Sequence, residues 1–337
     1  MKNIQADIKS GNFKQVYLLY GEEAYLKQQY KQNLVKALNP DGDTMNFNHY
    51  EGKGIDVKQL IDLCETMPFF AERRVVLLED TGFFKNKCEE LADYMKELPD
   101  YLYLVFAETE VDKRNRMYKA VKACGSIAEF IRQDEKTLMR WAAGILGKAG
   151  KKITQRDMEL LLTKTGTDMG NLRMEMEKLI SYTEGRDVVT AEDIEEICTT
   201  QTTNRIFDMV RAVTEKNQKR ALELYYDLLT LKEPPMRILF LLAKQYRQLL
   251  LAKQFAAAGL AQTEIASKLG VPGFVVRNIT TCARAYTISE LEQAVKDFVD
   301  AEESVKTGRL EDKLSVELLI IKYLSLIHIS EPTRHLR

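Results

Sequence analysis

Short runs of apolar, β-branched and aromatic residues alternate with helical patterns along the first 130 residues. The short runs predict β-strands at 16–19, 45–50, 74–78, 102–107 and 126–130. Between them, apolar positions spaced three or four residues apart predict helices at 22–38, 57–66, 85–98 and 114–123. Strands that alternate with helices form right-handed βαβ crossovers, which build a parallel sheet covered on both faces. We therefore predict a doubly wound α/β domain over residues 1–134.

After residue 130 the β-type runs stop and the pattern becomes helical. Helices are predicted at 138–146, 158–165, 172–182 and 191–198, and they form a small helical domain over 135–203. Thr190 predicts an N-cap for the last of them, with Asp193 completing a capping box. Residues 204–325 predict a third, all-helical domain. Its most apolar helix surrounds Ile238 and belongs inside a bundle or at a subunit seam.

Composition narrows the class of protein. The 337 residues are 45% hydrophobic and 29% charged, as in globular proteins. With 49 basic and 50 acidic side chains there is no general positive field for nucleic acid, so any charged partner must be met locally. The five cysteines lie at least 24 residues apart, which favours reduced thiols over a zinc site. No apolar run reaches the roughly 18–20 residues that cross a bilayer, and the polar start lacks the apolar stretch of a signal peptide. We expect a cytoplasmic protein.

The last twelve residues, LIHISEPTRHLR, continue neither the spacing nor the composition of the helix before them. The string resembles a translated sequencing adapter joined to the reading frame. We therefore predict that 326–337 is a non-native tail and exclude it from the fold. Without it, His49 is the only histidine.

The turn after the first strand is where a parallel α/β domain holds phosphate groups. A P-loop needs the pattern G-x-x-x-x-G-K-[ST] at that turn. Here Glu22 and Glu23 follow Gly21, and each would repel a phosphate by about 1 kcal/mol at 4 Å in water. With one native histidine and no grouped Ser, His and Asp, no catalytic, metal-binding or cofactor-binding residue can be named.

A cluster of cations follows the fourth predicted strand, at Lys113, Arg114 and Arg116. Cations at the carboxyl end of a sheet can contact the phosphates of DNA or an acidic neighbouring subunit. A solvated helix start accounts for the same residues, so both interpretations stay open.

Residues 261–284 have the spacing of a helix-turn-helix, with Gly270 in the turn. The second helix then exposes Arg277, Asn278 and Arg284, as a DNA-reading module would. Two packed helices joined by a glycine turn need the same small and apolar positions, so packing alone is the alternative.

The most informative segment is CETMPFFAERR, residues 64–74, between a predicted helix and a predicted strand. Pro68 stops the helix and leaves Met67, Phe69 and Phe70 in a short connection flanked by charge. Two adjacent phenylalanines in a loop do not readily face one core, so at least one is a candidate anchor for a partner's pocket. Packing in the core is the alternative.

Eight segments, taken in order, resemble the delta subunit family of the bacterial DNA polymerase III clamp loader, an AAA+ family. The resemblance spans 12–325 and implies a RecA-like domain without a P-loop, a helical lid and a helical collar. It implies a heteropentamer with the gamma/tau ATPase subunits and delta-prime, and no ATP hydrolysis by this subunit. The segments are VYLLYGEEAYL, PFFAERRVVLL, LVFAETEVDKRNRMYKAV, GNLRMEMEKL, NRIFDMVRAV, EPPMRILFLLAKQYRQLLLAK, EIASKLGVPGFVV and ISELEQAVKDFVDAEESVKTG.

The same resemblance implies roles for individual residues. It implies that Met67, Phe69 and Phe70 form a hydrophobic plug that binds the β sliding clamp near its subunit interface and favours the opened ring. Family members often carry Leu-Phe where this chain has Phe-Phe. Arg173 is similar to a sensor-2 residue and, with no nucleotide to sense, is expected to be structural or inter-subunit. DNA is met through the complex, and polymerase activity belongs to the subunit by association only. An active AAA+ ATPase and a helix-turn-helix DNA-binding protein are the alternatives.

Overall fold

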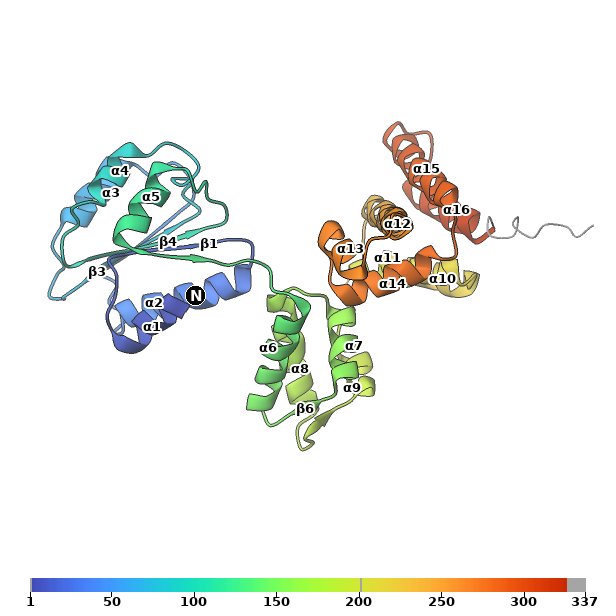
Figure 1. The fold of residues 1–337 in the computed structure, drawn as a ribbon, viewed down its shortest axis with the longest axis horizontal. Coiled ribbons are helices and arrows are strands. Elements are labelled where there is room, and N and C mark those ends of the chain that lie inside the picture. Colours follow the sequence, from blue (N-terminus) through green and yellow to red (C-terminus); the bar gives the residue numbers. More distant parts are fainter. Residues whose placement is uncertain (1, 201, 326–337) are drawn as a thin grey trace, which may run out of the picture. The chain divides into compact units, whose positions relative to one another are not determined.

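The computed structural model describes residues 2–200 and 202–325, and the chain divides into two compact units after Gln133 (Figure 1). The tail predicted at 326–337 lies outside the described residues. Among the residues that are described, no helix is long and apolar enough to span a bilayer.

The first unit is built on a five-stranded parallel sheet with the strand order β2-β3-β4-β1-β5. The register places Val16 beside Leu104 and Arg74 beside Leu102. All five predicted strands are confirmed to within two residues at each end. The strands at 16–20, 74–79 and 102–108 are buried and read as near-continuous apolar runs, whereas the strand at 47–51, at the edge of the sheet, is only partly buried. The strands are β1 (Val16–Tyr20), β2 (Phe47–Glu51), β3 (Arg74–Glu79), β4 (Leu102–Glu108) and β5 (Ser126–Glu129).

Helices cover both faces of this sheet (Figure 1). One face carries α1 (Lys2–Ser10) and α2 (Ala24–Leu38), and the other carries α3 (Val57–Glu65), α4 (Glu89–Tyr94) and α5 (Arg116–Cys124). Each face has its own apolar core, so the sheet is enclosed as a doubly wound α/β domain requires.

Two of these helices differ from the sequence-based expectation. α1 was not predicted, because KNIQADIKS has only Ile4 and Ile8 as large apolar residues; Ile4 is nevertheless fully buried against the sheet. α4 is shorter than the predicted 85–98, because the amides of Lys85 and Asn86 donate to the carbonyl of Gly82 in a turn before the helix.

The second unit begins with a small group of helices around a core of leucines and methionines. The capping box of Thr190 and Asp193 is present at the start of α9, as predicted. The expectation that β structure stops at residue 130 is wrong, since two short strands pair in parallel here; two residues are too few to show alternation. The elements are α6 (Glu135–Lys148), β6 (Lys152–Ile153), α7 (Gln155–Thr165), α8 (Met169–Tyr182), β7 (Val188–Val189) and α9 (Ala191–Ile197).

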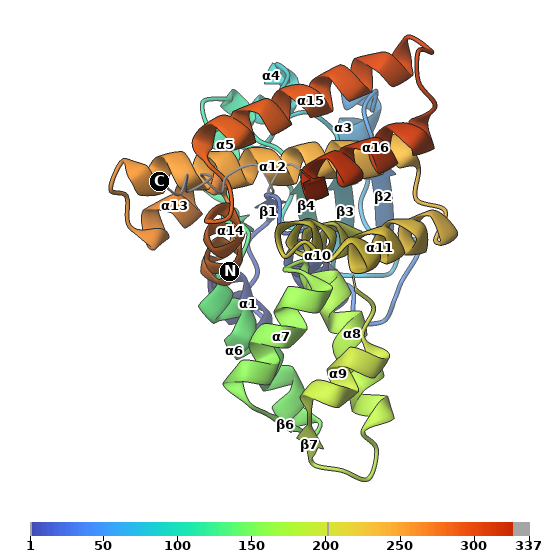
Figure 2. The ribbon, with the colours of Figure 1, turned by 90° about the vertical axis from the view of Figure 1, so that its right-hand side faces the viewer.

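The rest of the second unit is a helical bundle built around α12, which contacts α10, α13, α14, α15 and α16 (Figure 2). Ile238, Leu242, Tyr246 and Leu249 are buried on α12, so its predicted place inside a bundle is confirmed. The elements are α10 (Thr202–Thr214), α11 (Gln218–Thr230), α12 (Pro235–Ala257), α13 (Gln262–Leu269), α14 (Gly273–Ala283), α15 (Ile288–Lys306) and α16 (Asp312–Ser325).

The expected fold class is therefore confirmed: a parallel α/β domain is followed by helical structure. The core of α6–α9 and the core of α10–α16 are separate apolar clusters, although Val275 packs against both. The two compact units divide at residues 133 and 134, and the further boundary near residue 203 stays a prediction.

Candidate functional site

The plug loop, residues 66–73, joins α3 to β3 at the amino-terminal edge of the parallel sheet. Asp56 caps the amino terminus of α3, and its carboxylate accepts hydrogen bonds from the amides of the second and third residues that follow it. The helix ends at Glu65, close to Pro68, which lacks the amide that a longer helix would need. The chain must then reverse direction within the loop to enter β3 at Arg74.

The three apolar side chains of the plug loop point into solvent. Met67, Phe69 and Phe70 are 75%, 59% and 95% exposed. The rings of Phe69 and Phe70 meet edge to face, with their centroids 4.5 Å apart. The alternative that these residues pack in the core is therefore wrong. A cluster of large apolar side chains in water is typical of a surface that a partner covers.

The side chain of Asn46 hydrogen-bonds to the backbone of the plug loop. Its side chain is 4% exposed and lies just before β2. The amide of Phe69 donates to Asn46 Oδ1 at 2.6 Å, and Asn46 Nδ2 donates to the carbonyl of Phe69 at 2.9 Å. One side chain therefore binds both polar backbone groups of a single loop residue, much as a neighbouring strand would.

Two arginines hold the two ends of the loop. Arg74 is buried, and its guanidinium donates to the carbonyls of Thr66 and Met67 at 2.9 and 3.2 Å. These carbonyls follow the carboxyl end of α3, where a cation is favourable. Arg73 lies over the rings of Phe13 and Tyr103, at 5.2 and 5.5 Å from their centroids.

Phe70 has a left-handed backbone, with φ of +49°. That conformation costs a residue with a Cβ about 1–2 kcal/mol. The hydrogen bonds to the neighbouring Phe69 accompany this unfavourable backbone and help to hold it. The loop therefore gives up some stability to keep Phe70 outside the fold.

The carboxyl-terminal edge of the sheet, where a P-loop would lie, is filled by the chain itself. Gly21 has φ of +126°, and a Cβ on it would lie 2.3 Å from the carbonyl oxygen of Phe130. Glu108 is buried and accepts from the hydroxyl of Thr81 at 2.6 Å; burial raises the pKa of its carboxyl. Lys27 Nζ donates to the carbonyl of Glu108 at 2.9 Å, and burial lowers the pKa of this lysine. The polar groups at this edge thus bind one another.

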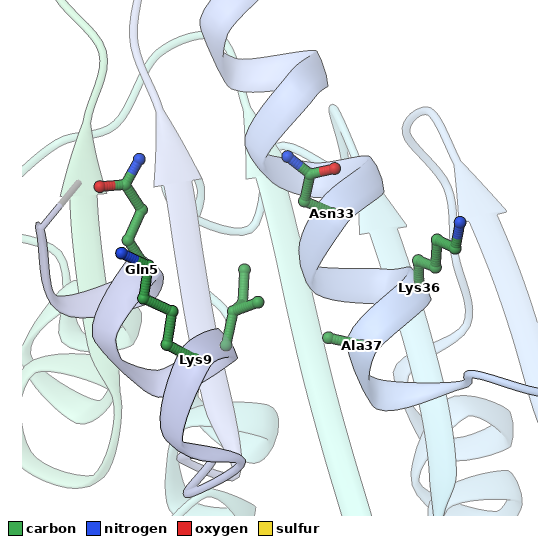
Figure 3. Close-up of a pocket in the computed structure, with 6 residues that line it drawn as sticks. Gln5, Lys9, Asn33, Lys36 and Ala37 are labelled. Atoms are coloured by element: carbon green, nitrogen blue, oxygen red, sulfur yellow. The ribbon is translucent and has the colours of Figure 1, made fainter.

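Cavities open on the same unit among the described residues. One of about 400 Å³ lies between α1 and α2, with Gln5 and Lys9 on one helix and Asn33, Lys36 and Ala37 on the other (Figure 3). Another, of about 670 Å³, lies beside α2 and β2. In it Glu79 binds both Lys31, at 2.5 Å, and His49, at 2.9 Å. No group of three or more metal-ligating side chains occurs among the residues described.

The cations Lys113, Arg114 and Arg116 each bind a carboxylate of their own unit. Their partners are Glu129, Asp112 and Asp93, at 2.8, 3.0 and 2.6 Å. The hydrogen bond from Lys113 holds the pKa of the Glu129 carboxyl below its ordinary value. The three are exposed but do not form a free basic patch, and contact with DNA or another subunit stays a prediction for each.

Arg173 lies on α8 and binds Glu177, one turn further along the same helix, at 2.7 Å. The pair accounts for this side chain within the unit. An inter-subunit role for Arg173 stays a prediction.

The predicted helix-turn-helix is present as α13 and α14, with Gly270 left-handed in the turn. Arg277 is exposed and lies 3.7 Å from Glu159 of α7. Arg284 is exposed and Asn278 is half-buried. Arg277 is therefore paired with a carboxylate of the same unit.

Sequence reasoning did not identify Asn46 or the role of Arg74 in the plug loop. Asn46 and Phe69 are 23 positions apart, and their contact depends on the parallel pairing of β2 with β3. The one signal that could have found this contact is the pairing of β2 with β3. Because these strands begin side by side, residue 46 lies next to the end of the plug loop that enters β3.

Two family models match the chain. The model described as "DNA polymerase III, delta subunit" matches residues 17–130, and the model for the C-terminal domain of the DNA polymerase III delta subunit matches residues 203–323. The first match contains the plug loop and the second contains the bundle around α12.

Two related sequences and one solved structure are similar to this chain over most of its length. The DNA polymerase III subunit delta of Bacillus subtilis is 26% identical over 98% of this chain and 99% of its own length. A chain of Aquifex aeolicus named "Probable DNA polymerase III subunit delta" is 22% identical over 76% of this chain and 75% of its own. The solved Bacillus subtilis DNA clamp loader delta protein superposes with a TM-score of 0.66, at 24% identity over 96% of this chain and 99% of that one.

The fold is thus that of a clamp-loader subunit. The chain belongs to the delta subunit family of DNA polymerase III, and it acts in DNA replication as a subunit of that holoenzyme.

Proposed function

We propose that this subunit binds the β sliding clamp through Met67, Phe69 and Phe70 and favours the opened ring, so that the clamp can be placed on primed DNA. The observation that carries the proposal is the exposure of these three side chains on a loop whose backbone is held by buried groups. The choice of the clamp as partner is supported by the similarity to the solved Bacillus subtilis DNA clamp loader delta protein.

The energy for this step comes from burial of apolar surface. Fully burying a phenylalanine side chain contributes about 1.5–3 kcal/mol. Phe69 and Phe70 together therefore offer at most about 6 kcal/mol, less the share of the Phe69 ring that the subunit already covers. Met67 adds a flexible thioether that adapts to an uneven pocket.

Opening follows as a population shift. A clamp ring exchanges between a closed form and a form with one released interface, and a ligand shifts this equilibrium by as much as its affinity for the two forms differs. A rigid plug that fits only the released form directs its binding energy to opening. No ATP hydrolysis by this subunit is required for that step.

The turn at Gly21 supports the non-hydrolysing role. Its close approach to Phe130 leaves no glycine-rich cradle for phosphates, and the positions that follow it hold Glu22, which is paired with Arg132 at 3.5 Å, and Glu23 in place of a P-loop's glycine and lysine. The ATP-dependent part of loading then belongs to the gamma/tau subunits, with delta-prime completing the heteropentamer. Primer-template DNA is met through that complex, in the cytoplasm.

A pull-down with the cognate β clamp tests the proposal. The double variant Phe69→Ala with Phe70→Ala is expected to lose clamp binding while its circular dichroism stays unchanged and its free energy of unfolding falls by no more than about 1.5 kcal/mol, which is the contribution of the ring contact. Phe240→Ala is the matched control, since Phe240 is 61% exposed on α12 of the other unit. Clamp retention by the double variant at the wild-type level would sink the assignment of the plug.

A further inference from the structure

We infer that Asn46 is a positioning residue that holds the plug loop in its clamp-binding shape before the clamp arrives. The inference rests on the proposed function and adds to it a residue that does not itself meet the clamp. Its basis is the pair of hydrogen bonds between one buried side chain and both backbone groups of Phe69.

Asn46 is itself firmly placed. Its carbonyl accepts from the amide of Val75, at the start of β3, at 2.9 Å. Its side-chain nitrogen also donates to the carboxylate of Asp43 at 2.5 Å, and this hydrogen bond is the main reason that the pKa of Asp43 is lowered. The asparagine therefore transmits the rigidity of the sheet edge to the middle of the loop.

The loop needs such support because, without the hydrogen bonds from Asn46, it is expected to favour a different conformation from the one in the structure. Phe70 has a left-handed backbone that side chains disfavour, and exposed aromatic rings gain by folding back onto the protein surface. Both hydrogen bonds from Asn46 are made to Phe69, the residue directly before Phe70. Without Asn46, the loop is expected to spend most of its time in conformations that cannot enter the clamp.

Positioning and direct contact have different kinetic signatures. A variant that lowers the population of the competent loop weakens apparent affinity by that fraction, and it does so by slowing association. A variant that removes a contact with the clamp speeds dissociation instead. The loss of two hydrogen bonds predicts about a tenfold smaller competent population.

The experiment measures association and dissociation rates of the full chain on immobilised cognate β clamp. Asn46→Ala is expected to slow association about tenfold and to leave the dissociation rate within twofold. Asn46→Asp is the second variant, being nearly isosteric; it cannot donate to the carbonyl of Phe69, so association is again expected to slow.

Asn115→Ala is the control for stability. Asn115 also binds backbone groups in the first unit, donating to the carbonyls of Phe83 and Asn86 and capping α5, but it is not part of the plug loop. This control is expected to lower the free energy of unfolding while both clamp rates stay at wild-type values.

Hydrogen exchange gives a readout that does not depend on the clamp. The Phe69 amide is expected to exchange slowly in the unmodified chain, although the loop is exposed, and rapidly in Asn46→Ala. The amides of β3 should keep their protection.

Each remaining outcome decides between the claims. Wild-type association by Asn46→Ala, with binding absent in the Phe69→Ala, Phe70→Ala double variant, overturns the inference and leaves the proposed function standing. A faster dissociation alone makes Asn46 a contact residue and also overturns it. Clamp binding by the double variant overturns the proposed function itself.

Discussion

Phe70→Asn separates clamp binding from folding more cleanly than truncation to alanine does. Phe70 is 95% exposed and has φ of +49°. Asparagine tolerates the left-handed region better than other residues with a Cβ, so the backbone of the loop can stay as it is. The substitution removes the aromatic ring and little else.

The expected magnitudes follow from these observations. Within the subunit, the ring contributes mainly its edge-to-face contact with Phe69, worth about 0.5–1.5 kcal/mol, and relief of backbone strain offsets part of this loss. The free energy of unfolding should therefore change by less than about 1 kcal/mol. Clamp binding loses about 1.5–3 kcal/mol of burial, which is roughly a 10- to 200-fold weaker affinity.

Surface plasmon resonance with immobilised clamp measures the affinity, and urea denaturation measures the stability of the same preparation. Phe240→Asn, which changes an exposed phenylalanine of the other unit, is expected to bind the clamp like the unmodified chain. Clamp affinity within twofold of wild type for Phe70→Asn would refute the role of Phe70 as an anchor. A loss of stability as large as the loss of affinity would refute the claim that the ring acts outside the fold.

Three further predictions concern the fold. Gly21→Ala places a Cβ against the backbone of Phe130 and should lower the free energy of unfolding by about 2–4 kcal/mol in urea titrations, whereas Gly54→Ala, also at positive φ but in open space, should cost less; equal costs would contradict the close approach. Cys124 is exposed and should react with iodoacetamide in the native protein, while the other four, buried cysteines react only on unfolding. Burial raises the pKa of the Cys64 and Cys198 thiols to about 12, so the unfolded chain releases these protons first and stability should fall as pH rises from about 8.5 toward 12; unchanged stability across that range would argue against their burial.

The parallel sheet was predictable because its physics is local to each strand. A strand that is enclosed on both faces must be largely apolar. The runs VYLLY and RVVLLE therefore predict strands without reference to the rest of the chain. α1 was not predictable in this way, since Ile4 and Ile8 gain their helical conformation from packing on the sheet. The two-residue strands β6 and β7 are too short to carry any pattern.

The residues of the candidate site likewise fall into those with a local sequence signal and those whose contacts depend on the fold. Pro68 and two adjacent phenylalanines predicted a short apolar connection, because both signals are local, but they left exposure and core packing open, and only the family resemblance favoured exposure. The support from Asn46 was hidden, since it exists only once β2 and β3 pair and bring residue 46 to the end of the loop. The ion pairs of Lys113, Arg114 and Arg116 were hidden for the same reason: two of their three partners come from other elements.

The central claim is that this subunit opens the clamp through the plug and without hydrolysing ATP. The most direct test loads the cognate β clamp onto nicked circular DNA, adds the purified chain alone, and follows release of the clamp by gel filtration. We predict that release is faster than without the chain, equally fast with and without Mg-ATP, and unaccelerated by the Phe69→Ala, Phe70→Ala double variant. Release at the unassisted rate, or acceleration only when Mg-ATP is present, would contradict this claim.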